Sequence, residues 1–145
     1  MNNKVRGLHI SYWAGVICVI FLTACAGANR DNVAQLEGKT WTLTAYDNSQ
    51  PIAGHQPTIL FEDGEISGST GCNHYGGTYQ SENDTIQFEQ IFSTEMACLE
   101  PVELMEQERL YLEALTMVSR YELENEILTF FSDSNSLLTF EIKGG

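Results

Sequence analysis

At residues 68–77 the chain reads GSTGCNHYGG, and at residues 93–98 it reads STEMAC. The first stretch has four glycines in ten residues, interrupted by one cysteine, one asparagine and one tyrosine. Glycine is required where the backbone φ is positive or where another group approaches the backbone closely. We therefore expect residues 68–77 to form a shaped turn between strands, with Cys98 as a partner for Cys72, which lies 26 positions earlier.

The N-terminus has the pattern of a targeting segment. Two basic residues precede a mostly apolar run without charges, which closes on the sequence LTAC at residues 22–25. This ending resembles the lipobox of bacterial lipoproteins, which implies that residues 1–24 are a signal peptide and that Cys25 becomes lipidated. An uncleaved anchor helix is the alternative, because the uncharged run of residues 8–24 lies at the short edge of the ~17–25 residues that span a bilayer.

Cleavage before Cys25 would leave 121 of the 145 residues, a length that suits one domain with a modest core. Residues 25–33 are small and polar, and they predict a lipidated cysteine followed by a short tether. The predicted domain then covers residues 34–143. The residue after Cys25 is Ala26 and not an aspartate. In a host with two membranes, this favours sorting of the lipoprotein to the periplasmic face of the outer membrane.

The mature chain is strongly acidic, with 20 acidic residues, 5 basic residues and a formal charge of −15. A nucleic-acid-binding protein needs a basic surface that displaces counterions, so the composition excludes nucleic acid as a partner. Anionic lipid headgroups would also repel the domain. Membrane attachment is therefore expected to come from the lipid anchor on Cys25 alone.

The mature chain changes from a strand pattern to a helix pattern and back again. Apolar and polar residues alternate along the predicted strands, which cover residues 40–45, 58–61, 65–68, 77–80, 85–88, 120–124, 127–132 and 137–142. Between Pro101 and Val118 the apolar residues recur at helical spacing, with Pro101 suited to the first helical position and Glu100 to the cap. The water-facing side of this helix is expected to hold Glu103, Glu106, Glu108 and Glu113. These patterns predict an α+β fold, a small curved antiparallel β-sheet or partial barrel with one amphipathic helix packed on it.

In combination, these motifs resemble the META domain, the HslJ-like family of bacterial envelope proteins. The resemblance rests on residues 36–43, 68–79 and 94–98, and on Tyr111 with Leu115 in the predicted helix. It implies a small β-rich fold with a single helix, often behind a lipoprotein signal. The family has no accepted catalytic residues, and its members look like stress-linked or secretion-linked envelope proteins, some of them tied to tolerance of the antibiotic novobiocin.

Cys72 and Cys98 are the two cysteines left after the signal and the lipidation site. Two such thiols in an exported domain most often pair, because the compartment is oxidising and small domains need cross-links. One alternative is a thiol nucleophile, with Cys72 activated by His74, although no third orienting group is evident. Another is a zinc site made of Cys72, His74, Cys98 and His55, although the close ligand pairs typical of zinc sites are missing.

The candidate binding residues are Asn73, His74, Tyr75 and Tyr79. Aromatic side chains beside a glycine-rich turn can line a shallow binding surface. In the alternative interpretation Asn73 bonds its own turn, His74 is a surface residue, and the two tyrosines belong to the core or its rim. The acidic residues between positions 62 and 84 lack the spacing of a calcium loop and indicate a solvated acidic surface.

We therefore expect a non-enzymatic lipoprotein of the bacterial envelope, without a cofactor or a metal ion, that acts through contact with another envelope protein. The turn at residues 68–77 is its expected contact surface. The alternative function is that of a module that binds a small apolar or cationic compound and contributes to antibiotic or envelope-stress tolerance. The acidic composition fits such a ligand.

Overall fold

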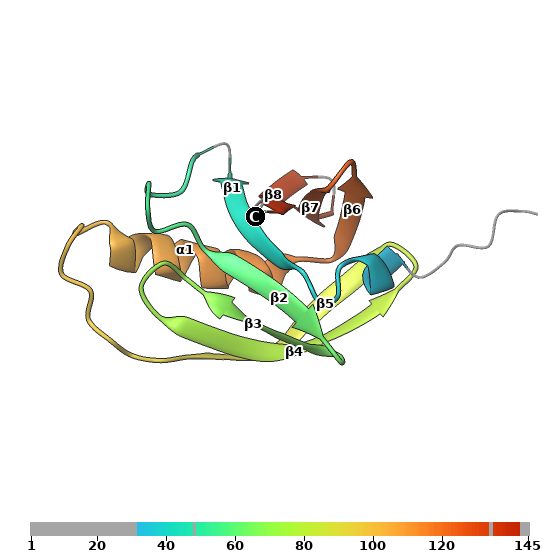
Figure 1. The fold of residues 1–145 in the computed structure, drawn as a ribbon, viewed down its shortest axis with the longest axis horizontal. Helices are drawn as coiled ribbons and strands as arrows, with labels where there is room; N and C mark the ends of the chain where they lie inside the picture. Colours follow the sequence, from blue (N-terminus) through green and yellow to red (C-terminus); the bar gives the residue numbers. More distant parts are fainter. Residues whose placement is uncertain (1–31, 48, 134, 143–145) are drawn as a thin grey trace, which may run out of the picture.

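The computed structural model describes residues 32–47, 49–133 and 135–142, and within them it has eight β-strands, one α-helix and a short 3-10 helix (Figure 1). The predicted signal peptide, the lipidation site Cys25 and most of the predicted tether lie outside these residues. Among the residues described, no helix combines the length and the apolar character that crossing a bilayer requires.

The elements follow one another in a simple order. They are η1 (Asn32–Gln35), β1 (Thr40–Tyr46), β2 (Thr58–Glu62), β3 (Glu65–Ser69), β4 (His74–Glu82), β5 (Thr85–Ser93), α1 (Leu104–Met117), β6 (Arg120–Glu124), β7 (Ile127–Ser132) and β8 (Asn135–Ile142). Each strand pairs antiparallel with the next, and β8 pairs with β1, so the strands form a closed ring. The join between β5 and β6 is thin, because these strands pair only at Thr85 and Arg120, and α1, which connects them, lies against β5.

The predicted α+β class is confirmed, and the strands close on themselves instead of leaving the free edges of an open curved sheet. Alternate residues of the strands point into one shared core, as their period-two patterns predict. Aromatic rings fill much of it: Phe130 packs edge-on against Phe88 and Phe140, with ring centroids 5.3 and 5.5 Å apart. Each such pair contributes about 0.5–1.5 kcal/mol beyond the burial of its area.

The folded part of the chain begins earlier than the sequence predicts. Residues 25–33 were expected to be a tether without regular structure, yet η1 starts at Asn32 and the side chain of Val33 packs against the core. Leu36 follows η1 and is fully buried, and its carbonyl accepts a hydrogen bond of 3.1 Å from Nε1 of Trp41. This apolar residue and its bond to β1 explain why the segment joins the fold.

The glycine-rich turn is shorter than predicted. β3 continues to Ser69 and β4 begins at His74, so that residues 70–73 alone connect the two strands. Gly76 lies inside β4, where the ring of Phe92 covers it so closely that an added Cβ would stand 2.8 Å from a ring carbon. This glycine therefore makes room for a neighbouring strand rather than forming a turn.

β5 continues beyond the predicted end at Phe88 to Ser93. The register between β4 and β5 shifts between Gly76 and Thr78, opposite Gln90, whose φ is +52°. Such a bulge inserts one residue into a strand and breaks the alternation. The pattern therefore stops at the bulge although the strand goes on.

The helix begins three residues later than predicted. Pro101 was expected at the first helical position with Glu100 as its cap, but the helix starts at Leu104 with Glu103 at the N-cap position. The carbonyl of Pro101 accepts the N–H of Leu104 at 3.0 Å. Pro101 thus opens a separate turn ahead of the helix. Met105, an apolar residue in the first turn of the helix, is 42% exposed.

Two core tyrosines join α1 to the sheet. The hydroxyl of Tyr75 in β4 lies 2.7 Å from that of Tyr111 in α1, and it donates to the carbonyl of Thr58 at 3.0 Å. Burial raises the pKa of Tyr111, and burial together with the Tyr111 hydroxyl raises the pKa of Tyr75 well above 10.0. Both phenols therefore resist losing a proton in the folded state.

These raised pKa values predict a loss of stability in alkali. The folded pKa values exceed the unfolded value of about 10, so the stability that they contribute is complete below about pH 10 and is lost as the pH rises above it. Replacing Tyr111→Phe should cost about 1 kcal/mol at pH 7 through the lost hydrogen bond, and it should make the fall above pH 10 less steep. Urea unfolding of the full chain followed by circular dichroism from pH 7 to 11.5 measures both effects.

The matched control for this measurement is Phe130→Leu. It damages the same core without removing a hydroxyl group, so the unfolding free energy should drop at every pH while the alkaline slope stays that of the unsubstituted chain. An alkaline slope that Tyr111→Phe leaves unchanged contradicts the assignment to the tyrosine pair.

Candidate functional site

The turn between β3 and β4, residues 70–73, is closed by Thr70. The N–H of Asn73 donates to the Thr70 hydroxyl at 2.9 Å, and the N–H of Thr70 donates to the Asn73 carbonyl at 2.8 Å. Gly71 has a φ of +97°, and a Cβ at this position would overlap the backbone carbonyl of His55. The turn therefore requires glycine both for its dihedral angle and for the close passage of a second loop.

The helix α1 supplies two buried polar side chains to this turn. Glu108 accepts hydrogen bonds from the Thr70 hydroxyl and from the backbone and side-chain N–H groups of Asn73, the last two at 3.2 and 3.1 Å. Gln107 donates from Nε2 to the Thr70 carbonyl at 3.2 Å. These four residues are at most 8% exposed, and we call Thr70, Asn73, Gln107 and Glu108 the buried polar cluster.

Gln107 also fixes the loop that connects β1 to β2. Its Oε1 accepts the N–H of Ile52 at 2.7 Å, and its Nε2 donates to the carbonyl of His55 at 2.8 Å. One side chain of the helix therefore holds two loops that lie far apart in the sequence. Among the residues described, every buried side-chain nitrogen and oxygen has a hydrogen-bond partner, as burial of polar groups requires.

Asn73 extends the cluster to the segment after β5. Its Oδ1 accepts the N–H of Met96 and the hydroxyl of Thr94, each at 2.8 Å, and its Nδ2 donates to the Met96 carbonyl at 3.1 Å. From its sequence context, Asn73 was expected either to bind a partner or to bond its own turn. Its amide is fully buried, which corrects the assignment as a binding residue. Nδ2 does bond its own turn, at Sγ of Cys72 at 3.4 Å, but the amide also bonds a segment more than twenty residues away.

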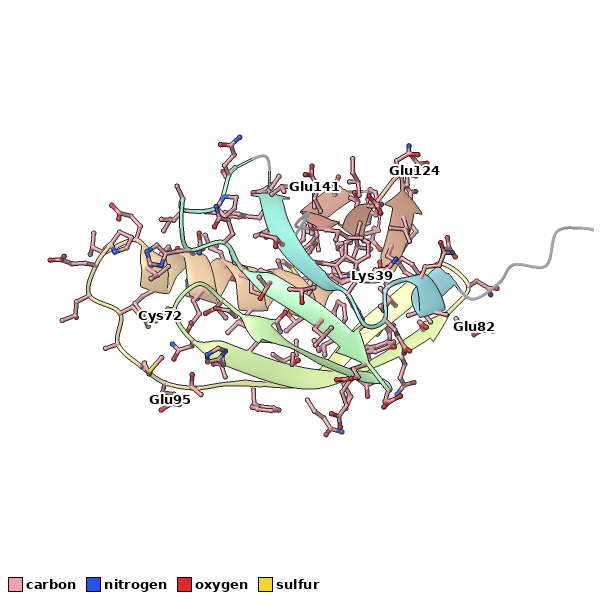
Figure 2. All side chains as sticks on the ribbon, viewed as in Figure 1. Lys39, Cys72, Glu82, Glu95, Glu124 and Glu141 are labelled. Atoms are coloured by element: carbon pink, nitrogen blue, oxygen red, sulfur yellow. A yellow bond between two sulfur atoms is a disulfide. The ribbon has the colours of Figure 1, made fainter. Side chains whose placement is uncertain are left out.

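A disulfide joins Cys72 to Cys98 next to these bonds, with the Cα atoms 6.0 Å apart, in agreement with the pairing favoured by the sequence. A cross-link between positions this far apart contributes about 3 kcal/mol in the chain-entropy treatment. Together with Asn73, it fixes residues 94–98 against the glycine-rich turn (Figure 2).

The other candidate binding residues have different environments. Tyr75 is 4% exposed and belongs to the core, which corrects its assignment as a binding residue. His74 is exposed at the start of β4. Tyr79 is half-buried, and its hydroxyl donates to Glu37 at 2.8 Å. Burial, followed by the bond to Glu37, raises the pKa of Tyr79 to about 12. The four candidates therefore do not share one binding surface.

The residues of the alternative zinc site are engaged in other interactions. Cys72 and Cys98 share their disulfide, and Nδ1 of His55 lies 3.3 Å from the Gly71 carbonyl. Within the described ranges, no three side chains of histidine, cysteine, aspartate or glutamate gather as metal ligands. A thiol nucleophile needs a free thiolate, which Cys72 does not provide while it is bonded to Cys98.

A groove of about 690 Å³ lies elsewhere, between α1 and the ends of β1 and β8. Its lining consists of Tyr46, Asp47, Ser49, Leu110, Glu113, Ala114, Met117, Asn135, Ser136 and Leu137. Asp47 and Glu113 bring carboxylates to this lining, while Leu110 and Met117 bring apolar surface. The groove therefore combines negative charge with apolar walls.

Sequence reasoning missed Gln107 and misplaced Glu108, which was expected on the water-facing side of the helix. The misplacement had a readable signal. Leu104, Tyr111 and Leu115 mark the buried stripe, and position 108 lies four residues after the first and three before the second. Residues at these spacings share one face of a helix, so a glutamate at position 108 must enter the core side. A buried carboxylate in turn requires hydrogen-bond donors.

The buried polar cluster yields a prediction about coupling. Replacing Glu108→Ala leaves the Thr70 hydroxyl and the N–H of Asn73 without their acceptor, and it should lower the unfolding free energy by about 2–4 kcal/mol. Asn73→Ala should be similarly costly, and the double variant should be less destabilised than the sum by at least about 1 kcal/mol. Urea unfolding of the full chain measures this double-mutant cycle.

Glu113→Ala provides the control on the same helix. Its carboxylate is exposed and pairs with Arg109 at 2.8 Å, so its loss should change stability little and should be additive with Asn73→Ala. Additive effects for Glu108 and Asn73 contradict a shared cluster.

Comparison with known proteins agrees with this fold. An NMR structure of a protein from Burkholderia xenovorans has 26% sequence identity and a TM-score of 0.66, covering 79% of this chain and 88% of that one. A second NMR structure has 25% identity and a TM-score of 0.61, covering 75% of this chain and 92% of that one. A crystal structure of a DUF4847 family protein from Bacteroides vulgatus shares the fold at 17% identity, with a TM-score of 0.57, and covers 73% and 93%.

No curated protein sequence matches the chain significantly. The family model of the META domain matches residues 34–144, which include all eight strands up to Ile142 and the helix. The resemblance drawn from the sequence motifs is thereby confirmed. The chain belongs to the META domain family.

Proposed function

We propose that this protein is a non-enzymatic lipoprotein of the bacterial envelope, held by acyl chains on Cys25, that acts in stress or secretion through contact with another envelope protein. The motivation for the anchor is the LTAC sequence at residues 22–25 behind an apolar run. Attachment of the acidic mature chain to a membrane would require such an anchor, because anionic headgroups repel its negative charge.

The proposal rests on one observation: the polar and thiol groups of the most specialised motifs are bonded to other groups of the same protein. Asn73 and Glu108 bond other protein groups, and Cys72 bonds Cys98. A catalytic group must instead be free to meet a substrate, with an orienting partner beside it. Side chains committed in this way support a scaffold that displays a surface to a partner.

Lipidation gives the first test. In cells grown with an alkyne-bearing fatty acid, the full chain should become labelled, and Cys25→Ala should abolish the label and leave residues 1–24 attached, because the lipobox cysteine is lost. Cys18→Ala is the matched control, since it removes a cysteine of the signal segment and should leave labelling intact. An unlabelled chain that retains residues 1–24 would instead support the anchor-helix alternative.

Contact with a partner is the second part of the proposal. Formaldehyde crosslinking of intact cells, during growth and under envelope stress, should capture the labelled chain in a defined complex. If crosslinking captures nothing above background under either condition, action through protein contact is wrong even where lipidation is correct.

The groove beside α1 favours a second candidate function, the binding of a small cation with apolar substituents. Its volume of about 690 Å³ lies in the range of ligand pockets, about 300–1,000 Å³. The carboxylates of Asp47 and Glu113 suit a positive charge, although Glu113 also pairs with Arg109. The apolar side chains of Leu110 and Met117 suit the substituents.

Thermal unfolding with benzyltrimethylammonium tests this candidate. At ten times its dissociation constant the ligand should raise the Tm of the full chain by about 4 °C, and the gain should vanish in the variant Asp47→Asn with Glu113→Gln. Neopentylbenzene, a neutral compound of similar shape, should give no comparable gain. An equal gain in Tm with the charged and the neutral compound contradicts an acidic ligand groove. So does an equal gain with the ammonium ion in the unsubstituted chain and in the double variant.

A further inference from the structure

Four aliphatic and thioether side chains stand exposed on the segment that leads into α1 and on the first turn of α1. Met96 is 53% exposed, Leu99 81%, Val102 76% and Met105 42%. We call these four residues the apolar ridge. Single exposed apolar residues are ordinary on protein surfaces, whereas a contiguous apolar patch indicates an interaction surface. These four residues lie within ten positions of one another along the chain.

The backbone beneath the apolar ridge is fixed at several points. Asn73 bonds both the N–H and the carbonyl of Met96. Two residues further on, the disulfide holds Cys98, and the turn from Pro101 to Leu104 leads into the helix. Such a segment loses little conformational freedom when it binds, and this saving favours affinity. The exposed side chains are therefore presented by a rigid support.

The charge around the apolar ridge has a single sign. Between residues 92 and 108, all the charged residues are acidic, and Glu95, Glu100, Glu103 and Glu106 are exposed. The nearest cation along the chain, Arg109, is bonded to Glu106 and Glu113. Lys39 lies well away from the segment in Figure 2. The apolar ridge is therefore bordered by negative charge, of which Arg109 offsets that of Glu106.

The position of the apolar ridge also bears on its partner. Figure 1 shows the segment between β5 and α1 at one end of the long axis of the molecule, while η1, where the described chain begins, lies near the other end. If the chain is tethered through its N-terminus, this end of the domain points away from the tethering membrane. A partner can then reach it without competing with the bilayer.

We propose that the apolar ridge docks into an apolar groove of a partner protein whose rim carries lysine or arginine. This inference rests on the proposed function and names the surface and the chemistry of the contact. Charge decides between the possible occupants: a second copy would bring two sets of glutamates together, and an anionic bilayer would repel them, whereas a basic rim is attracted. Leu99 and Val102, the most exposed of the four, are the expected anchors in the groove.

Site-specific photocrosslinking in cells tests the inference with the full chain. The photoreactive residue p-benzoylphenylalanine is placed at Ala97, which is exposed beside the apolar ridge, and in a control chain at Ile127 on β7, which is 42% exposed. We expect a protein adduct from position 97 that position 127 does not give. Mass spectrometry of the adduct should map the contact to apolar residues of the partner flanked by lysine or arginine.

Substitutions then separate the contribution of apolar contact from that of charge. Leu99→Ser with Val102→Ser should lower the yield of the adduct at least tenfold without changing the Tm, because both side chains are mostly exposed. Replacing Glu95, Glu100 and Glu103 by glutamine should lower the yield severalfold. Ile127→Ser is the matched control, since this apolar residue is 42% exposed on β7, away from the apolar ridge, and should leave the yield unchanged.

Each other outcome overturns the inference. An adduct with a second copy identifies self-association, and one with phospholipid identifies a membrane contact. An adduct that maps to an acidic segment, or whose yield ignores both sets of substitutions, contradicts the basic-rimmed groove. If formaldehyde captures a complex while position 97 captures none, the inference fails and the proposed function stands. If neither method captures a partner, the proposed function fails as well.

Discussion

The order of the β3–β4 turn and of the segment after β5 depends on the hydrogen bonds of the buried Glu108 carboxylate. A carboxylate removed from water loses several kilocalories per mole of solvation, and here three hydrogen bonds from Thr70 and Asn73 replace that solvation. These bonds set the position of α1 against the glycine-rich turn. Asn73, oriented by Glu108, can then bond Met96 and Thr94 with its remaining amide atoms. The order of the segment after β5 thus follows from one charge on the helix.

Much of the fold follows from local patterns, and the departures have local causes. Alternation predicted all eight strands because each buries one face in a common core. The end of β5 was predicted too early because the bulge at Gln90 breaks the alternation. The helix start was misplaced because Pro101 is equally suited to the turn before a helix. The closure of the ring by β1 and β8 depends on pairing between the two ends of the domain, about which a local pattern carries no information.

The candidate site shows a different limit of sequence reasoning. The motifs at residues 68–77 and 93–98 were correctly joined through Cys72 and Cys98, because paired thiols are a property of composition and compartment. The role of Asn73 was not predictable in the same way, since its partners on the segment after β5 and on α1 lie twenty-one to thirty-five positions away. An asparagine that binds a ligand and one that binds a distant backbone look identical in sequence. The stripe spacing at position 108 was the one available signal, and a charged residue there should have been assigned to the core side.

If the apolar ridge docks as proposed, the buried polar cluster serves the same contact, because it fixes the backbone beneath the ridge. A buried carboxylate and amide are a costly way to stabilise a helix, and apolar side chains of similar volume often do as well or better. What hydrogen bonds add is direction: they hold the backbone at Met96 in one orientation, where an apolar contact would tolerate several. That constraint has little value for a loop that only connects β5 to α1. It has value for a segment whose exposed side chains must meet a partner in a fixed geometry, because rigidity before binding lowers the entropy lost on binding.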